Sequence, residues 1–439
     1  MLYDVAALVS SVALGPVAEA FGVHEIAQHS IVVSLEHAPE ALPFPLPVAP
    51  LPFIGPEPDA ALGESSQGAL VLLQLSSLEP WAIPGYVNEH PDAIAEVLAA
   101  PPAPQSVAVW WDSMRLDARN ILRTSTPELV GNLDGVPYAV RDVANRQLLG
   151  STIIDLEFSI ANEPGRTIVE NAKQQLNMLQ SISGALGDAS TGDARRTLLS
   201  LDVTGQGRAA IVVGDLVTAD YVTYMVPGMF FTIEGQMTYW TDAAARLRDE
   251  QLSWKALFGD TDSTVATVAW IGYHTPNLTN VGGIENAEEA RDSLASTIEG
   301  LQAIRGADEP YVTVIAHSYG STAALMALTE DDFDIDALAV VGSPGSPAQS
   351  VDELHVKNHN VYVGEAAWDP VPNSAFFGSD PGAESYGARG FGTDGGVDPI
   401  TGDTLTRSFF HIEYFSPGTE SLRNLALISS GLGEYVSPR

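Results

Sequence analysis

The 439 residues of the chain include 56 acidic and 20 basic side chains, so the formal net charge at pH 7 is −36. A charge of this size repels phosphate backbones and anionic membranes, and we therefore exclude nucleic acid as an expected partner. The chain has no cysteine, which rules out disulfides, thiol catalysis and cysteine metal sites. Hydrophobic residues make up 45% of it, enough for a large core.

Residues 1–105 are predicted to be an N-terminal extension. Residues 1–21 are apolar but carry an aspartate and lack the basic segment of a signal peptide, which favours a packed helix and a cytoplasmic location. No run of about 18 uncharged apolar residues predicts a membrane span. The many prolines of residues 42–58 predict an extended, Pro-rich arm. A helix at 90–100, followed by the linker PPAPQ, indicates a boundary near residue 105.

Residues 106–195 are predicted to be helical. Trp110, Trp111, Leu116 and Leu122 lie at spacings that place them on one side of a helix. We interpret the two tryptophans as core side chains rather than as a substrate platform. Residues 167–187 show a helical period without an internal proline. We expect this region to form a lid-like cap over the part of the chain that follows.

From residue 196 to residue 439 the pattern changes to alternating strands and helices. This alternation predicts an α/β domain with a mainly parallel sheet and right-handed crossovers. The strands are predicted at residues 197–204, 208–215, 220–229, 265–273, 311–316, 336–345 and 360–371. The helices between them are predicted at residues 237–252, 286–306 and 320–328.

The clearest functional signal lies between the fifth predicted strand and the helix after it. The segment AHSYGS (316–321) is a variant of the G-x-S-x-G nucleophile elbow, with Ala316 at the first small position. Such a turn strains the backbone of the serine and lifts its hydroxyl clear of the sheet, next to the N–H groups of the helix. We therefore predict that Ser318 is a nucleophile. The alternative is an ordinary turn between a strand and a helix.

A serine nucleophile needs a histidine base and a carboxylate that orients it. In the α/β fold expected here, the serine comes first along the chain, the acid follows it and the histidine comes last. His411, which stands between the last predicted strand and a C-terminal helix, is preferred over His355 and His359, which we place in an exposed loop. Asp369 directly follows a predicted strand and is the preferred acid. The competing acids are Asp331, Asp332, Asp334, Asp336, Asp380 and Asp394.

The transition state of such a reaction needs N–H donors for a developing oxyanion. One donor is expected from Tyr319, the residue after the nucleophile. The other is expected in the loop VPGMF after the third predicted strand, where Gly228 allows a close approach of the backbone. Met229 is the preferred donor there, and Phe230 remains open.

The substrate pocket is assigned to residues near the same edge of the sheet. Its predicted members are Gly228, Phe230, Tyr273 and His317. A packed core position is the alternative for Tyr273. The loop 372–403 is expected to cover this edge together with the helical region. Aspartates 394, 398 and 403 in this loop are interpreted as acidic turns rather than calcium ligands, so no metal and no cofactor are predicted.

Several motifs stand in one order along residues 106–435. They are a WW pair (110–111), GNLDGVP-x-x-x-RD-x-AN (131–145), VPGM (226–229), WxGY (270–273), the elbow, VGSPG (341–345) and DPV (369–371). In this combination the chain resembles a family of actinobacterial α/β-hydrolases that are mostly uncharacterised. It departs from the family pattern at Ala316, where glycine is usual, and in the sequence HIEYF around His411.

The resemblance implies an α/β-hydrolase fold and a serine hydrolase, without implying a particular substrate. We therefore predict hydrolysis of small carboxylic esters through an acyl-enzyme. Cleavage of amides or peptides by the same residues is one alternative. The other is a hydrolase fold without catalysis, whose N-terminal half binds a protein partner. The sequence leaves the oligomeric state open.

Overall fold

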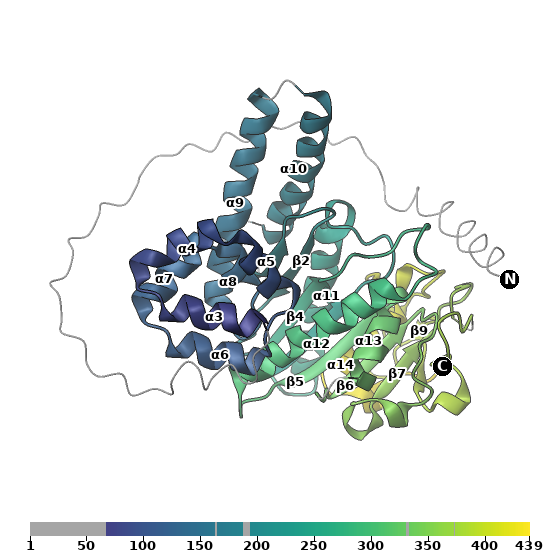
Figure 1. Ribbon diagram of the computed structural model, residues 1–439. Helices are drawn as coiled ribbons and strands as arrows, with labels where there is room; N and C mark the ends of the chain where they lie inside the picture. Colours follow the sequence, from purple (N-terminus) through teal and green to yellow (C-terminus); the bar gives the residue numbers. More distant parts are fainter. Residues whose placement is uncertain (1–66, 163–164, 188–193, 331–332, 373) are drawn as a thin grey trace. The chain divides into compact units, whose positions relative to one another are not determined.

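The structure is a computed structural model (Figure 1). It describes residues 67–162, 165–187, 194–330, 333–372 and 374–439. The expectations for residues 1–66, which were a packed helix and a Pro-rich arm, lie outside the described residues.

An eight-stranded sheet forms the centre of the described part of the chain. Its strands stand in the order β1-β2-β4-β3-β5-β6-β7-β8. Their bounds are β1 Arg196–Asp202, β2 Arg208–Val213, β3 Tyr221–Val226, β4 Val265–Ile271, β5 Tyr311–His317, β6 Ala337–Val341, β7 Val361–Gly364 and β8 Arg389–Phe391. Only β2 runs antiparallel to its neighbours, and the other pairings are parallel. The predicted α/β fold with a mainly parallel sheet is confirmed.

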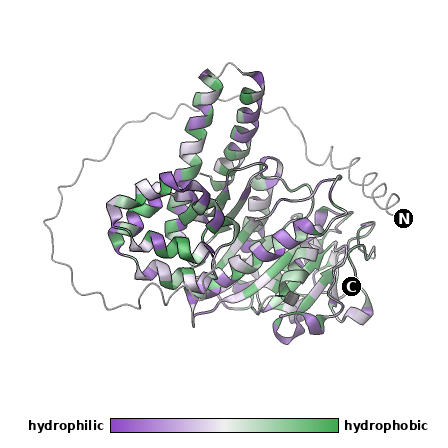
Figure 2. Cartoon of the chain, viewed as in Figure 1, coloured by the Kyte–Doolittle hydropathy of each residue, from purple (hydrophilic) through white to green (hydrophobic). Residues whose placement is uncertain are grey.

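Helices cover both faces of the sheet. On one face, α12 (Glu285–Arg305) and α13 (Tyr319–Glu330) pack on the strands, and on the other α11 (Ile233–Leu257) and α14 (Glu420–Ser429) do so. Because both faces are covered, the central strands are mostly hydrophobic along their length (Figure 2). Every residue of β4 is buried. Because β3, β5, β6 and β7 run parallel to one another, their carboxyl ends lie at the same edge of the sheet.

A bundle of short helices precedes the sheet. These helices are α3 (Gln67–Ser77), α4 (Ile83–Glu89), α5 (Pro91–Ala99), α6 (Pro104–Ser113), α7 (Leu116–Ser125) and α8 (Pro127–Asn132). They share one hydrophobic core that runs from Ala69 to Ala144. Trp110 and Trp111 are buried in it, as predicted, and the Trp110 Nε1–H donates to the Leu72 carbonyl at 2.9 Å. The predicted boundary near residue 105 falls within the span of this core.

Two long helices, α9 (Tyr138–Asn162) and α10 (Arg166–Leu186), complete the helical region. They lie side by side (Figure 1). Helix α9 packs along the outer strand β1. There the Asn145 amide donates to the Leu198 carbonyl at 3.1 Å, and the Leu198 N–H donates to the Asp142 carboxylate at 2.8 Å. The region expected to be a lid-like cap is thus fixed to β1, four strands away from β5.

The opposite edge of the sheet is also covered. Strand β8 lies within the expected loop 372–403 and pairs with β7, so part of this loop belongs to the sheet. On its outer side, the Gly392 N–H donates to the Ser437 carbonyl at 2.8 Å and the Arg439 N–H donates to the Gly390 carbonyl at 3.3 Å.

Short elements fill the connections. A separate pair of strands is formed by β9 (Gly396–Val397) and β10 (Thr404–Leu405). The single-turn helices are η1 (Pro80–Ala82), η2 (Val351–Glu353), η3 (Lys357–His359), η4 (Glu384–Tyr386), η5 (Glu413–Phe415) and η6 (Gly433–Tyr435).

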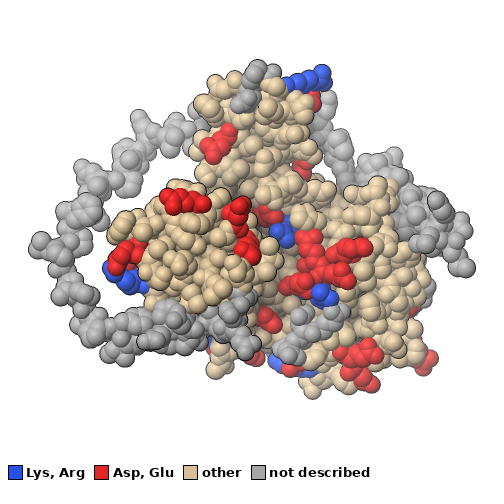
Figure 3. All heavy atoms as spheres, in the orientation of Figure 1, with Lys and Arg blue, Asp and Glu red and all other residues tan. Residues whose placement is uncertain are grey.

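The surface in Figure 3 carries many more acidic than basic side chains, in keeping with the 56 acidic and 20 basic residues of the sequence. Among the helices of the described residues, none is both long enough and apolar enough to cross a membrane.

Candidate active site

Ser318 occupies a sharp turn between β5 and α13. Its φ angle is 54°, in the left-handed region that serine rarely adopts, and its N–H donates to the Val341 carbonyl at 3.0 Å. The neighbours two residues away must be small: Ala316 is fully buried, and a Cβ atom on Gly320 would lie 2.3 Å from the Pro227 carbonyl oxygen. The strained turn therefore holds the serine hydroxyl at the carboxyl edge of the sheet.

The structure brings together the three residues that we predicted from the sequence. The Ser318 Oγ and the His411 Nε2 are 2.6 Å apart, and the His411 Nδ1 lies 3.0 Å from each carboxylate oxygen of Asp369. Asp369 is supplied by the loop after β7, and His411 by the turn before α14. Gly342 makes room for the pair, because a Cβ atom there would lie 2.9 Å from both side chains.

The two other histidines beyond the serine lie elsewhere. The His355 Nδ1 is 3.6 Å from a carboxylate oxygen of Asp334, and the His359 Nδ1 is 3.5 Å from one of Asp352. Both histidine side chains are exposed, as we expected from their predicted loop.

The Asp369 carboxylate is held by groups other than the histidine. The Tyr414 hydroxyl donates to its Oδ2 at 2.7 Å, and the Val371 N–H donates to its Oδ1 at 2.9 Å. Burial by itself raises the pKa of Asp369, but the nearby His411 and these hydrogen bonds outweigh it and hold the pKa below its ordinary value. The side chain is therefore an ionised acceptor at neutral pH.

Tyr414 was missed by our sequence analysis. Its hydroxyl also accepts a hydrogen bond from the Ala366 N–H at 2.8 Å, so it links the carboxylate to the loop that carries it. Burial, and then the charge of Asp369, raise the pKa of Tyr414 well above its ordinary value, so the phenol stays protonated and donates. The only sequence signal was a tyrosine three positions after His411, in HIEYF.

His317, which we predicted to line the substrate pocket, contacts the loop that carries His411. Its ring is buried, and the Nε2–H donates to the backbone carbonyl of His411 at 2.6 Å. The rings of His317 and His411 are 4.6 Å apart, and the ring of Phe415 packs at 6.1 Å. Burial lowers the pKa of His317 to about 3, helped by the adjacent His411. His317 is thus a neutral side chain that holds the loop of the base in place.

We expect His317→Gln to flatten the acid side of the stability profile. Below the ordinary pKa of 6.5, His317 binds a proton in the unfolded chain, whereas in the folded chain it does not bind one until the pH falls to about 3. The free energy of unfolding therefore falls by roughly 1.4 kcal/mol per pH unit from this one group as the pH drops below 6.5. Glutamine keeps an amide donor for the His411 carbonyl but does not titrate.

Urea unfolding of both proteins between pH 4 and pH 7 measures this slope. The difference in stability at pH 7 reports the changed contact at position 317, and a change in that difference as the pH falls reports the proton. Parallel curves over the whole range would contradict the assignment of the proton.

The loop after β3 approaches the serine very closely. A Cβ atom on Gly228 would lie 2.5 Å from the Cβ of Ser318, so only glycine fits there. The Phe230 N–H already donates to the Pro276 carbonyl at 3.0 Å, which removes the alternative oxyanion donor that the sequence left open. In the described part of the chain the Met229 N–H has no such acceptor. Met229 stays the preferred donor of this loop.

Tyr273, which we predicted as a pocket residue with a packed core position as the alternative, contacts the loop after β3. It is fully buried, and its hydroxyl donates to the Pro227 carbonyl at 2.8 Å. The packed position that we kept as the alternative for Tyr273 is therefore the one found. The hydroxyl of Tyr319 donates to the Gly283 carbonyl at 2.8 Å and points away from the serine, which leaves its backbone N–H as the group near the nucleophile.

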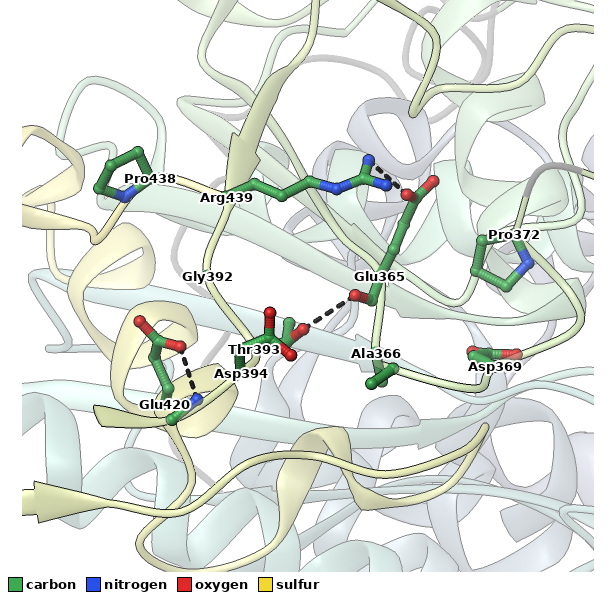
Figure 4. A pocket seen from close by; sticks show the side chains of 12 residues that line it. Glu365, Ala366, Asp369, Pro372, Gly392, Thr393, Asp394, Glu420, Pro438 and Arg439 are labelled. Carbon is green, nitrogen blue, oxygen red and sulfur yellow. Dashed lines mark hydrogen bonds and ion pairs between the residues drawn. The ribbon is translucent and has the colours of Figure 1, made fainter.

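A cavity of about 400 Å³ lies beside Asp369 (Figure 4). In it, the Glu365 carboxylate pairs with Arg439, and the Thr393 hydroxyl donates to the Glu365 carbonyl at 2.8 Å. Asp369 is part of the lining, whereas Ser318 and His411 are not. The cavity therefore reaches the three residues only through the carboxylate. Its lining residues are Glu365, Ala366, Ala367, Asp369, Pro372, Gly392, Thr393, Asp394, Gly395, Glu420, Pro438 and Arg439.

Comparisons with known proteins match parts of the chain. A family model described as an alpha/beta hydrolase matches residues 202–379. An uncharacterised protein of Mycobacterium tuberculosis is 25% identical over 86% of the chain, and the match spans 64% of that relative's length. An uncharacterised protein of Mycobacterium bovis is 28% identical over 45% of the chain and 77% of its own length. The chain thus spans less than two thirds of the first of these relatives.

Two solved structures match part of the chain at low identity. A dienelactone hydrolase from Anabaena variabilis has a TM-score of 0.33 and 13% identity, and the match covers 56% of this chain and all of that one. An esterase from Pyrobaculum calidifontis has a TM-score of 0.31 and 14% identity, with coverage of 64% and 97%. The chain has the α/β-hydrolase fold that we predicted, with the serine after the fifth of eight strands. Membership of the actinobacterial family stays a prediction.

Proposed function

We propose that the protein is a serine hydrolase that cleaves carboxylic esters through an acyl-enzyme on Ser318. The observation that carries this proposal is the unbroken chain of hydrogen bonds from Ser318 through His411 to Asp369. A lone hydroxyl is a poor nucleophile at neutral pH, and this arrangement supplies both the base and the group that orients it.

In the first half of the reaction, the Ser318 Oγ attacks the ester carbonyl carbon while its proton passes to the His411 Nε2. The Asp369 carboxylate stabilises the imidazolium that forms. The negative oxygen of the tetrahedral intermediate accepts hydrogen bonds from the Met229 and Tyr319 N–H groups. When the intermediate collapses, the bond to the alcohol oxygen breaks and His411 returns the proton to that oxygen. An acyl group then remains on the serine.

In the second half, water replaces the alcohol. His411 removes a proton from the water as its oxygen attacks the acyl carbon, and the collapse of the second intermediate returns that proton to the Ser318 oxygen. The products are an alcohol and a carboxylic acid, and the enzyme is regenerated. Amide cleavage would use the same steps with an amine as leaving group. Esters are the better supported substrates because alcohols leave more readily.

Two measurements on the purified protein test this proposal. A fluorophosphonate probe should label one residue, identified as Ser318 by mass spectrometry of the peptides, and p-nitrophenyl acetate should be hydrolysed with a burst of p-nitrophenol. Prior labelling should abolish the hydrolysis. An unlabelled protein that turns over no ester would instead favour the non-catalytic binding protein that the sequence left as an alternative.

A further inference from the structure

The two loops that supply Asp369 and His411 each expose an aromatic side chain next to that residue. Trp368 precedes the acid and is 77% exposed, and Phe410 precedes the histidine and is 44% exposed. Of the seven tryptophans in the chain, all of which are described, five are buried. The other two, Trp81 and Trp368, are exposed, and Trp368 is the one of them that stands next to a residue of the proposed site.

The backbone holds these aromatic residues in place. Trp368 has a φ angle of 65° and Phe410 one of 52°, both in the left-handed region, which costs on the order of 1–3 kcal/mol for a residue of this size. The two loops are joined, because the Phe410 N–H donates to the Ala367 carbonyl at 3.1 Å and Phe409 forms a bridge with Ala367. Phe409, 39% exposed, lies beside Phe410, with ring centres 6.4 Å apart and ring planes tilted by 41°. We call Trp368, Phe409 and Phe410 the aromatic rim.

The chemistry of the site decides which half of a substrate the aromatic rim meets. The oxyanion points towards the Met229 loop, on one side of the serine. The leaving oxygen must lie beside the His411 Nε2, because that atom returns its proton. Phe410 and Trp368 are the chain neighbours of His411 and Asp369, and on that ground the inference assigns the aromatic rim to the side where the alcohol departs.

We propose that the aromatic rim binds the alcohol half of the ester, and that this half is an apolar chain or ring system. The inference rests on the proposed function and names its substrate class. Exposed aromatic side chains gain the most binding free energy when they contact apolar groups of a ligand. Each methylene that becomes fully buried raises the affinity about fourfold. The net charge of −36 favours neutral esters over anionic amphiphiles.

Scattered apolar side chains are common on protein surfaces, and Trp81 provides the comparison. It is 80% exposed, lies in η1 in the helical bundle, and belongs to no part of the proposed site. A substitution of Trp81 is thus a matched control for the same substitution of Trp368.

The test measures kcat/KM in a pH-stat for two series of dissolved esters. In one, acetate is esterified with ethanol, butanol, hexanol and octanol, so the acyl-enzyme is common to all. In the other, ethanol is esterified with acids of the same lengths. The variants are Trp368→Asn, Phe410→Asn and Trp81→Asn, since asparagine accepts the left-handed backbone at positions 368 and 410. Thermal unfolding establishes that each variant is folded.

We expect octyl acetate to exceed ethyl acetate at least tenfold in kcat/KM for the unmodified protein, the effect of about two buried methylenes. Trp368→Asn and Phe410→Asn should each lower this ratio about tenfold, while Trp81→Asn keeps it. If one rim variant does not fold, the ratio of the other decides. A flat alcohol series, a preference confined to the acid series, or an unchanged ratio in the rim variants would overturn the inference while leaving the proposed function intact. A protein that hydrolyses no ester and is not labelled at Ser318 overturns the proposed function itself.

Discussion

Ser318→Ala should reduce ester turnover by a factor on the order of 10⁶, the usual loss when a serine nucleophile is removed from such an arrangement. Alanine leaves the His411 Nε2 without the hydroxyl that lies 2.6 Å away, so no acyl-enzyme can form. Initial rates with p-nitrophenyl acetate and loss of fluorophosphonate labelling measure the effect. The fold should persist, because alanine is smaller than serine in the same turn.

The matched control is Ser253→Ala. This serine lies on α11 and donates only to the Asp249 carbonyl at 2.8 Å, so its removal should leave turnover unchanged. Hydrolysis by the Ser318→Ala variant at the rate of the unmodified protein would refute the nucleophile and, with it, the proposed function.

Asp369→Asn should lower kcat by roughly 10³ to 10⁴ while the protein remains folded. The carboxylate accepts hydrogen bonds from the His411 Nδ1–H, the Tyr414 hydroxyl and the Val371 N–H. An amide has one oxygen in place of two, so its NH2 group must face a donor or turn the imidazole into the wrong tautomer. Steady-state kinetics with p-nitrophenyl acetate measure the loss.

Asp334→Asn serves as the control, since Asp334 was a competing acid in the sequence and is exposed beside His355. It should retain full activity. A similar modest loss in both variants would show that Asp369 does not orient the base.

The elbow and the sheet were predictable because the strands there are buried on both faces. A strand such as β5 is continuously apolar, which separates it clearly from the helices on either side. Asp369 was chosen as the acid from its position directly after a predicted strand. His411 was chosen as the base from chain order, which left three histidines after Ser318. The structure places both side chains in one chain of hydrogen bonds with Ser318.

The predicted boundary near residue 105 falls within a packed core for a reason that concerns proline. We interpreted the prolines of PPAPQ as a linker between domains. In the structure Pro104 stands at the start of α6, and Pro91 and Pro127 start α5 and α8 in the same way. Proline fits the first turn of a helix, where its missing N–H has no partner to lose. A proline-rich segment therefore marked a helix start within one packed bundle.

Three side chains of the site could not be placed from the sequence because their roles depend on contacts between distant segments. His317 contacts a carbonyl 94 residues away, and Tyr273 contacts one 46 residues away. Both were taken for pocket residues because they follow strands. Tyr414 meets Asp369 across 45 residues. Neither local periodicity nor composition reports such pairings.

The covered edges of the sheet restrict how copies of this protein can associate. Side chains from α9 hydrogen-bond to the backbone of β1, and residues 437–439 run along β8. Neither outer strand therefore offers a free row of backbone donors and acceptors, the template through which sheets of separate molecules fuse. The addition of a strand to the eight-stranded sheet would first require one of these two covers to detach.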